Sequence, residues 1–395
     1  MNSNNRSKSV LINSLIARDI SEPHRAATAL ELFYDLIYVI AIASLATELH
    51  HALSNWHQVG HAITMYIVVF FCIWWPWNAY TWFASGYDTD DAQFRLSSFA
   101  QMIGVIIIAV GVKPAFADND FLIMMIGYVI MRVPYILMWL KVGHDDPASY
   151  PVAMRYALGV FLVQIAWTIS VLYIQNWYII IALIFFEILI PYVAENAVEK
   201  EKNTKYHFGH IEERLGLLTI IVLGESMLAI VYAFKSVIEH FSTDLFTLAV
   251  SSVLILFSMW WLYFDDLVED KLANKKKSFI WGYGHYFIYG FAAAVGVLIS
   301  VNVDVLTDHA KIDGSIALTG LAIVIAGYLV SVWLCHDYLL DKKGLKRYEL
   351  LILAATVIGI AILTNSPFLI SAVFVALIAL RLARKHRQLK RQYTG

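Results

Sequence analysis

The sequence predicts an all-α integral membrane protein, a polytopic bundle of about twelve transmembrane helices built as two parallel six-helix repeats. Hydrophobic residues make up 59% of the 395-residue chain and charged residues only 15%. A soluble globular chain is about half apolar and about a quarter charged. Twelve apolar runs approach the ~20 residues that a helix needs to cross hydrocarbon. The excess apolar surface is therefore expected to face lipid.

Helices are the expected spanning elements, because irregular backbone cannot face lipid. In chain order, the expected spans cover residues 31–49, 59–83, 94–112, 119–140, 156–174, 177–194, 215–234, 244–264, 280–301, 315–335, 348–364 and 367–383. Residues 156–194 and 348–383 each hold two runs divided by a short polar tip. A single helix of either length would overshoot the bilayer, so each pair is expected to form a helical hairpin.

The distribution of Lys and Arg tests this assignment of spans. With the N-terminus placed in the cytoplasm, 25 of the 29 Lys and Arg residues fall in cytoplasmic segments. Only Lys113, Lys235 and Lys311 fall on the opposite side, and Arg132 lies within a span. This is a strong positive-inside pattern. Both termini are therefore expected in the cytoplasm.

The two halves of the chain share features. The first span opens with Glu31 and Asp35 and the seventh with Glu213, and the second and eighth spans both hold a Trp-Trp pair before an acidic loop. Six spans per half is an even number, so the repeats insert with the same orientation. The expected parts are a cytoplasmic arm at 1–30, repeats at 31–194 and 213–383, a linker at 195–212 and a basic cytoplasmic tail at 384–395. Residues 1–20 either form an amphipathic surface stretch or stay disordered, and disorder is the preferred interpretation.

Ionisable side chains inside the spans are the candidate functional residues, because each costs about 2.5–3.5 kcal/mol in hydrocarbon unless it is paired, hydrated or functional. Glu31 and Asp35 lie one turn apart at the cytoplasmic entrance. They either attract a cation or stabilise the helix N-terminus. Glu225 is expected near the midplane beside Ser226. It either coordinates a cation or relays a proton, or else it pairs with Arg132 or bonds a neighbouring hydroxyl.

Other charges are expected to be supporting groups. Arg132 pairs with either Glu187 or Glu225, and Glu213 and Arg214 complete the supporting set. A group of residues at the outer end of the first two spans comprises Glu48, His50, His51, His57 and His61. No Cys or well-spaced carboxylate completes a metal site there. These residues are therefore interpreted as solvated, and no metal ion or other cofactor is expected.

Two segments carry a family resemblance: ELFYDLIYVIAIASLATEL, which follows His24-Arg25, and HFGHIEERLGLLTIIVLGESMLAIV at 207–231. On these motifs the chain resembles the low-temperature-requirement protein A (LtrA) family over residues 20–385. The resemblance implies a multi-pass protein of the bacterial plasma (inner) membrane. The Glu-x-Phe-x-Asp motif is also similar to the endolysosomal and prokaryotic potassium-channel family, with Tyr34 in place of that family's Ser. That resemblance implies a pore-lining first helix with Ile40 at its constriction.

Three functions stay open. The leading hypothesis is a transporter or channel for a small solute or cation that uses Glu31, Asp35 and Glu225. The alternatives are a membrane-embedded enzyme acting on a lipid and a non-catalytic membrane stress-adaptation factor. The chain has no P-loop, dinucleotide fingerprint or HExxH motif. The expected partners are the lipid bilayer and a small cation or proton, with a homodimer as a further possibility and no nucleic acid.

Overall fold

The structure is a computed structural model that describes residues 11–19, 22, 25–174, 176–198, 203–265, 275–340 and 344–394, without the side chains of 275, 276, 345 and 388–394. Several sequence features fall outside these described residues: positions 1–10 of the arm, 199–202 of the linker, 266–270 of the second acidic loop and the side chains at the end of the basic tail.

The described residues hold twelve helices long and apolar enough to cross a membrane, which confirms the all-helical fold and the twelve predicted spans. They are α1 (Ala29–Ser54), α2 (Val59–Tyr87), α3 (Ala92–Asp118), α4 (Leu122–Asp145), α5 (Tyr150–Ile169), α6 (Trp177–Asn196), α7 (Phe208–Glu239), α8 (Thr243–Phe264), α9 (Lys275–Leu306), α10 (Gly314–Val332), α11 (Glu349–Thr364) and α12 (Pro367–Thr394). Two π-helical turns, η1 (Ser170–Ile174) and η4 (Trp333–Tyr338), continue α5 and α10, and a 3-10 turn, η5 (Gly344–Tyr348), precedes α11.

Both predicted hairpins are present, and local capping explains where their helices end. The Asn176 side chain accepts a 2.8 Å hydrogen bond from the backbone N–H of Tyr178 and so caps the start of α6. Asn365 ends α11 in the left-handed conformation (φ 48°), which asparagine tolerates at a helix C-terminus. Pro367 then begins α12, where its missing N–H costs nothing.

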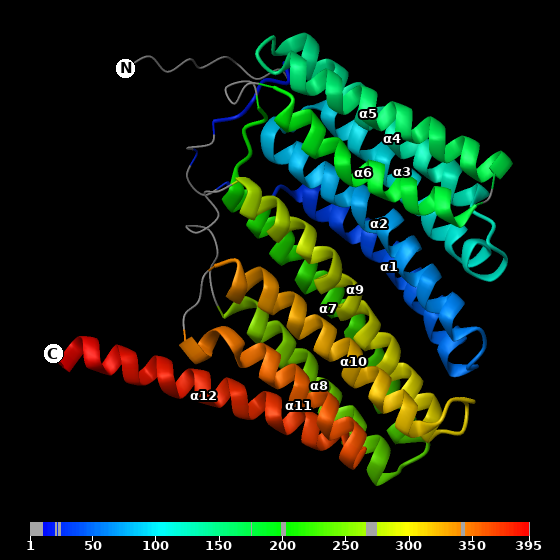
Figure 1. Ribbon diagram of the computed structural model, residues 1–395, viewed down its shortest axis with the longest axis vertical. Coiled ribbons are helices and arrows are strands. Elements are labelled where there is room, and N and C mark those ends of the chain that lie inside the picture. The colour runs from blue at the N-terminus through cyan, green and yellow to red at the C-terminus, as the bar shows by residue number, and fades with distance from the viewer. Residues whose placement is uncertain are drawn as a thin grey trace. The chain divides into compact units, whose positions relative to one another are not determined.

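The chain forms two compact units. Unit 1 comprises residues 1–45 and 68–214, and unit 2 comprises residues 46–67 and 215–395. In unit 1, α3 packs on α4, α4 on α5 and α5 on α6. In unit 2, α10 packs on both α9 and α11, and α12 packs on α8 and α11 (Figure 1). The division falls within α1, α2 and α7, and the two sequence repeats stay a prediction.

Glycines let α3 and α4 approach closely within unit 1. A Cβ built on Gly104 would lie 2.5 Å from the carbonyl oxygen of Gly127, and a Cβ on Gly127 would lie 2.6 Å from the carbonyl oxygen of Gly104. Membrane helices associate through such small-residue contacts, because lipid supplies no hydrophobic force between them. The α3–α4 pair is therefore a rigid part of unit 1.

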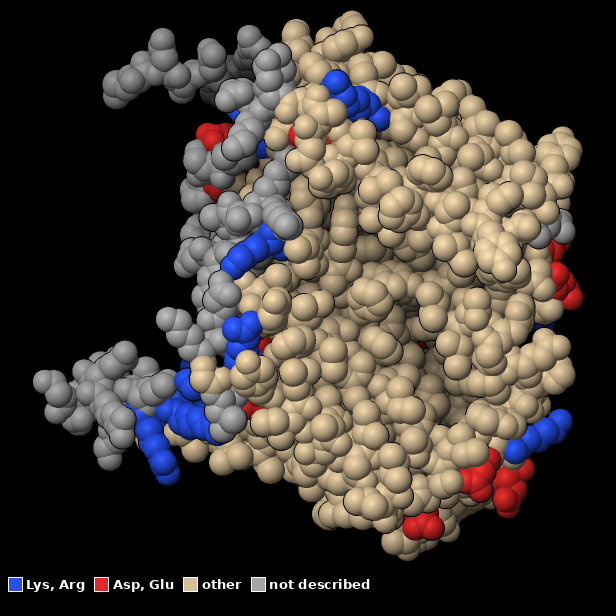
Figure 2. Space-filling model, in the orientation of Figure 1, with Lys and Arg blue, Asp and Glu red and all other residues tan. Residues whose placement is uncertain are grey.

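Charged side chains lie mainly near the helix ends in both units. Figure 2 shows Lys, Arg, Asp and Glu near the ends of the helices, with uncharged surface along the helix lengths between them. Large apolar side chains are exposed along these lengths, among them Leu158, Phe161 and Leu162 of α5. Apolar exposure on this scale is expected of a surface in contact with lipid.

Residues 11–19 of the N-terminal arm differ from the expected disorder. They lie across the loops at the ends of the unit 1 helices, without helical structure. The backbone N–H of Asn13 donates to the Asp91 carboxylate over 2.6 Å, and that of Leu15 donates to Asp145 over 3.0 Å. The Leu15 side chain is buried. Sequence reasoning missed this segment because the acceptors lie far along the chain.

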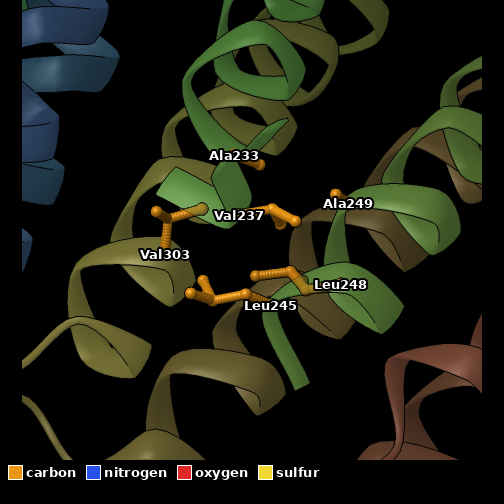
Figure 3. Packing of buried hydrophobic residues seen from close by; sticks show 6 residues of the cluster. All are labelled: Ala233, Val237, Leu245, Leu248, Ala249 and Val303. Carbon is orange, nitrogen blue, oxygen red and sulfur yellow. The ribbon is translucent and has the colours of Figure 1, made fainter. Parts of the chain in front are cut away.

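At the other end of α7, an apolar cluster joins three helices of unit 2. It comprises Ala233 and Val237 of α7, Leu245, Leu248 and Ala249 of α8, and Val303 of α9 (Figure 3). All six side chains are buried. This packing fixes the last turns of α7 and α9 against each other. We call the ends at which α1, α7 and α9 begin proximal and the ends at which they finish distal.

Candidate functional site

The proximal ends of α1 and α7 meet in a buried charge cluster within unit 1. The Arg214 guanidinium lies between two carboxylates: Nη1 is 3.0 Å from Glu31 Oε1, and Nη2 is 2.5 Å from Asp35 Oδ1. The Arg214 Nε also donates to Asp35 Oδ2 over 3.3 Å. All three side chains are fully buried. Such a pair persists away from water only when its geometry is good and further hydrogen bonds satisfy the remaining atoms.

Neighbouring groups supply those hydrogen bonds. The Trp77 Nε1–H of α2 donates to Asp35 Oδ1 over 2.7 Å. The His210 Nε2 of α7 lies 3.2 Å from the Glu31 carboxylate. Thr28 and Glu31 form a reciprocal capping box: the Thr28 N–H donates to Glu31 Oε2 over 2.8 Å, and the Glu31 N–H donates to Thr28 Oγ1 over 3.2 Å. Glu31 therefore stabilises the start of α1 as well as pairing with Arg214.

Glu213, the other expected supporting charge, binds the arm instead of a cation. Its Oε2 accepts a 3.1 Å hydrogen bond from the backbone N–H of Ala27, just before α1. This contact and the Arg214 cluster both tie the start of α1 to the first turns of α7. The adjacent residues Glu213 and Arg214 thus both hold the N-terminal end of α1. Glu213 binds the backbone of Ala27, and Arg214 binds the side chains of Glu31 and Asp35.

A second ion pair lies at the C-terminal end of α2. Arg25 donates to the carbonyl oxygens of Ala84, over 2.7 Å, and Ser85, and its Nη2 lies 3.8 Å from Asp88 Oδ2. Burial raises the pKa of Asp88 to about 6, and the negative charge of Glu31 adds to this effect. Asp88 lies just beyond the α2 span, so it is the acid of this region most open to titration near neutral pH.

The second buried pair of unit 1 joins α4 and α6. Of the two partners expected for Arg132, the structure places Glu187 beside it, with Arg132 Nη2 3.1 and 3.0 Å from the two carboxylate oxygens. The Trp75 Nε1–H of α2 donates to Glu187 Oε2 over 2.8 Å. The Arg132 guanidinium also lies 5.3 Å from the ring centroid of Tyr128, within cation–π distance.

Glu225 differs from these paired acids. Its side chain is half-buried on α7, and no described residue makes an ion pair or hydrogen bond with its carboxylate. Its neighbour Ser226 is buried and donates to the carbonyl oxygen of Ala292 on α9 over 3.0 Å. A Cβ on Gly296 would lie 3.0 Å from the Ser226 Cα. Ser226 is thus a packing contact between α7 and α9, whereas Glu225 is left without a cation.

Ile40, expected at a pore constriction, lies on the exposed face of α1. Its side chain is 49% exposed, and Leu36, one turn earlier, is 50% exposed. Glu31 and Asp35 lie on the buried face of the same helix. The structure therefore separates Ile40 from the acids that share its helix.

The histidines predicted at the distal end do not form a cluster. His50 Nε2 lies 2.8 Å from Asp304 Oδ2 on α9, whereas His51 only stacks against His50, with ring centroids 5.6 Å apart. Within the described ranges, no three His, Cys, Asp or Glu side chains are close enough to hold a metal ion. Sequence reasoning missed Asp304 because it lies beyond the expected span 280–301, whereas α9 continues to Leu306.

Comparison with known proteins gives one family and one relative. The family model of the bacterial low temperature requirement A protein matches residues 26–383. The uncharacterized protein RA0937 of Rhizobium meliloti (strain 1021) is 27% identical over 275 residues. That alignment covers 66% of this chain and 65% of the relative, so the chain spans slightly less than two thirds of that protein's length.

Proposed function

Because the chain belongs to the bacterial low temperature requirement A family of membrane proteins, with twelve helices able to cross a membrane, we propose that it transports a small cation or protons through the bacterial inner membrane. Glu225 carries the transported charge in this proposal. The excess of Lys and Arg on one side of the spans supports a cytoplasmic location for both termini.

One observation carries the proposal: of the four intramembrane acids predicted as functional or supporting groups, three face a cation and one does not. Glu31 and Asp35 face Arg214, and Glu187 faces Arg132. Glu225 has no such partner among the described residues. An ionised side chain at the bilayer centre costs about 2.5–3.5 kcal/mol on the insertion scale. Water, a bound cation or a proton must therefore offset the charge of Glu225.

The position of Glu225 along its helix supports the same assignment. α7 has 32 residues, which at ~1.5 Å per residue makes it about 48 Å long. Glu225 is about 26 Å from its start by the same rise, close to the middle. A carboxylate at this depth, half-exposed on its helix, can accept a proton or cation from either end.

The Arg214 cluster has a different role in this proposal. Its charges are fully buried and paired with one another, so it holds α1 and α7 together and does not carry the transported ion. In this proposal Glu225 takes the ion-attracting role expected for Glu31 and Asp35, and the two proximal acids are structural groups that hold the start of α1 to α7.

The test is ion flux into liposomes that contain the purified full-length protein, with proton, Na⁺ and K⁺ gradients applied in turn. Glu225→Gln keeps the size of the side chain and removes its charge, and we expect it to lower the flux about tenfold or more. Lys235→Gln is the control, because Lys235 lies on the same helix and is exposed, 3.8 Å from Glu239. Flux that survives Glu225→Gln, or no flux in any gradient, would contradict the proposal. The second result would favour the non-transporting stress-adaptation factor.

A further inference from the structure

Asp304, near the distal end of α9, gathers polar side chains from two other helices of unit 2. Its Oδ2 lies 2.8 Å from His50 Nε2 and accepts a 2.7 Å hydrogen bond from Ser54 Oγ, both on α1. Its Oδ1 accepts a 2.9 Å hydrogen bond from the Tyr232 hydroxyl on α7. A carboxylate bound from three directions is a built site rather than a solvated surface acid.

The packing around these side chains keeps them in place. Ala233 and Val303, which follow Tyr232 and precede Asp304 in the chain, belong to the buried apolar cluster that joins α7, α8 and α9 (Figure 3). The backbone N–H of Lys311 donates to the carbonyl oxygen of Ser54 over 2.7 Å and holds the end of α1 to the α9–α10 loop. The hydrogen bonds of Asp304 therefore rest on a rigid support.

Tyr232 and Glu225 lie on the same face of α7. The two residues are seven positions apart, which at 100° per residue places them within about 20° on the same face and about 10.5 Å apart along the axis. The tyrosine hydroxyl, bonded to Asp304, and the unpaired Glu225 thus lie on one stripe of one helix. A short chain of water molecules can span a gap of this length.

The Asp304 side is also accessible to water. The side chain of His50 is 23% exposed and that of Asp304 is 10% exposed. The other titratable groups facing this site are His51 on α1, stacked against His50, and Glu239 on α7, whose charge acts on Tyr232. No third helix brings a Lys or Arg side chain into an ion pair with Asp304 among the described residues.

We propose that Asp304 is the distal proton-loading site of this protein, with Tyr232 as the link to Glu225 and His50 as the positioning residue. The inference rests on the proposed transport function and names the proton as its ion. A hydronium ion at the distal surface gives its proton to the Asp304 carboxylate and leaves water. The carboxylic acid then donates to the Tyr232 oxygen, while the Tyr232 hydrogen passes through water to Glu225. One proton has moved, Asp304 is again ionised and Tyr232 is unchanged.

The test measures proton flux into proteoliposomes, with a pH-sensitive dye inside and the outer pH varied. Tyr232→Phe keeps the ring and removes the hydroxyl, and we expect flux to fall about tenfold or more. Asp304→Asn should do the same, while Asp304→Glu should recover flux. His50→Gln should shift the dependence on distal pH, an effect that loss of packing alone would not produce. Asp308→Asn is the neighbouring control and should match the unmodified protein.

The outcomes separate this inference from the proposed function. Proton flux that requires Glu225 but is unchanged in both Tyr232→Phe and Asp304→Asn overturns the proton-loading site and leaves transport intact. Flux of Na⁺ or K⁺ without protons that still requires Glu225 also overturns the loading site alone. If the unmodified protein shows no flux, or if its flux does not depend on Glu225, both the loading site and the proposed transport function are overturned. A thermal unfolding curve for each variant in detergent confirms that lost flux reflects lost chemistry and not a misfolded chain.

Discussion

Replacing Arg214 with methionine should destabilise the protein strongly, and more at neutral than at acidic pH. The change removes the cation that lies 3.0 Å from Glu31 and 2.5 Å from Asp35 at a fully buried site. Glu31 keeps His210 and its capping hydrogen bonds, so its charge is still partly compensated. Among the described residues, Asp35 then keeps the hydrogen bond from the Trp77 N–H but no cation, so it becomes an unpaired buried carboxylate.

The magnitude follows from the cheapest way to relieve that charge, which is protonation. Protonating a carboxyl group of ordinary pKa at pH 7 costs about 4 kcal/mol, at ~1.4 kcal/mol per pH unit. Breaking a buried ion pair by removing one partner costs about 3–5 kcal/mol in measured cases. We therefore expect Arg214→Met to lower the free energy of unfolding by about 4 kcal/mol at pH 7 but by only about 1 kcal/mol at pH 5.

The assay is denaturant unfolding in detergent micelles, followed by the fluorescence of the twelve Trp residues. Adding Asp35→Asn to Arg214→Met removes the stranded charge and keeps an acceptor for Trp77, so the double variant should recover more than half of the lost stability. Arg95→Met is the control, because Arg95 is exposed in its pair with Asp90, and it should cause no measurable change. An equal loss at pH 5 and pH 7, or a double variant no better than the single one, would refute the reasoning.

Three further predictions use the same unfolding assay. Arg132→Met alone should cost about 3–5 kcal/mol, whereas Arg132→Met with Glu187→Gln should cost much less, because no buried charge is then left unpaired; equal losses would contradict this. Burial raises the Asp88 pKa to about 6, so the folded state binds this proton more tightly and stability should fall, by about 3 kcal/mol at most, as pH rises from about 4 to about 6. Asp88→Asn should remove that slope. Gly127→Ala should cost about 1–3 kcal/mol, because its Cβ would lie 2.6 Å from the Gly104 carbonyl oxygen; an unchanged midpoint would show that α3 and α4 separate freely.

The sequence alone predicted the spanning helices, because the length of an apolar run and the position of Lys and Arg report directly on the bilayer. The hairpin tips were equally readable, since Asn365 and Pro367 have local conformational reasons to end one helix and begin the next. The Thr28–Glu31 capping box was readable by the same logic but was not recognised as such. These features depend on neighbours in the chain.

The partners of the intramembrane charges could not be predicted in the same way. Arg214 and Asp35 are 179 residues apart, and no periodicity within α1 or α7 says which faces of the two helices meet. Arg132 had two plausible carboxylates by depth alone, and only the tertiary structure of unit 1, in which α5 packs on both α4 and α6, places Glu187 beside it. Asp304 was overlooked because it lies beyond the expected span 280–301 and because its three hydrogen-bond partners come from other helices.

The contrast between paired and unpaired acids makes the stability of this chain separable from the transport proposed for it. Removing a charge from a satisfied pair leaves its partner buried alone, so Arg214→Met and Arg132→Met should lower stability. Removing the charge of Glu225 leaves no oppositely charged side chain unpaired, and it removes the cost of desolvating the carboxylate. Glu225→Gln should therefore leave stability unchanged or raise it. Residues that store strain or desolvation for function often show this opposition between stability and activity. A Glu225→Gln variant that is both inactive and destabilised would instead place Glu225 in a structural contact.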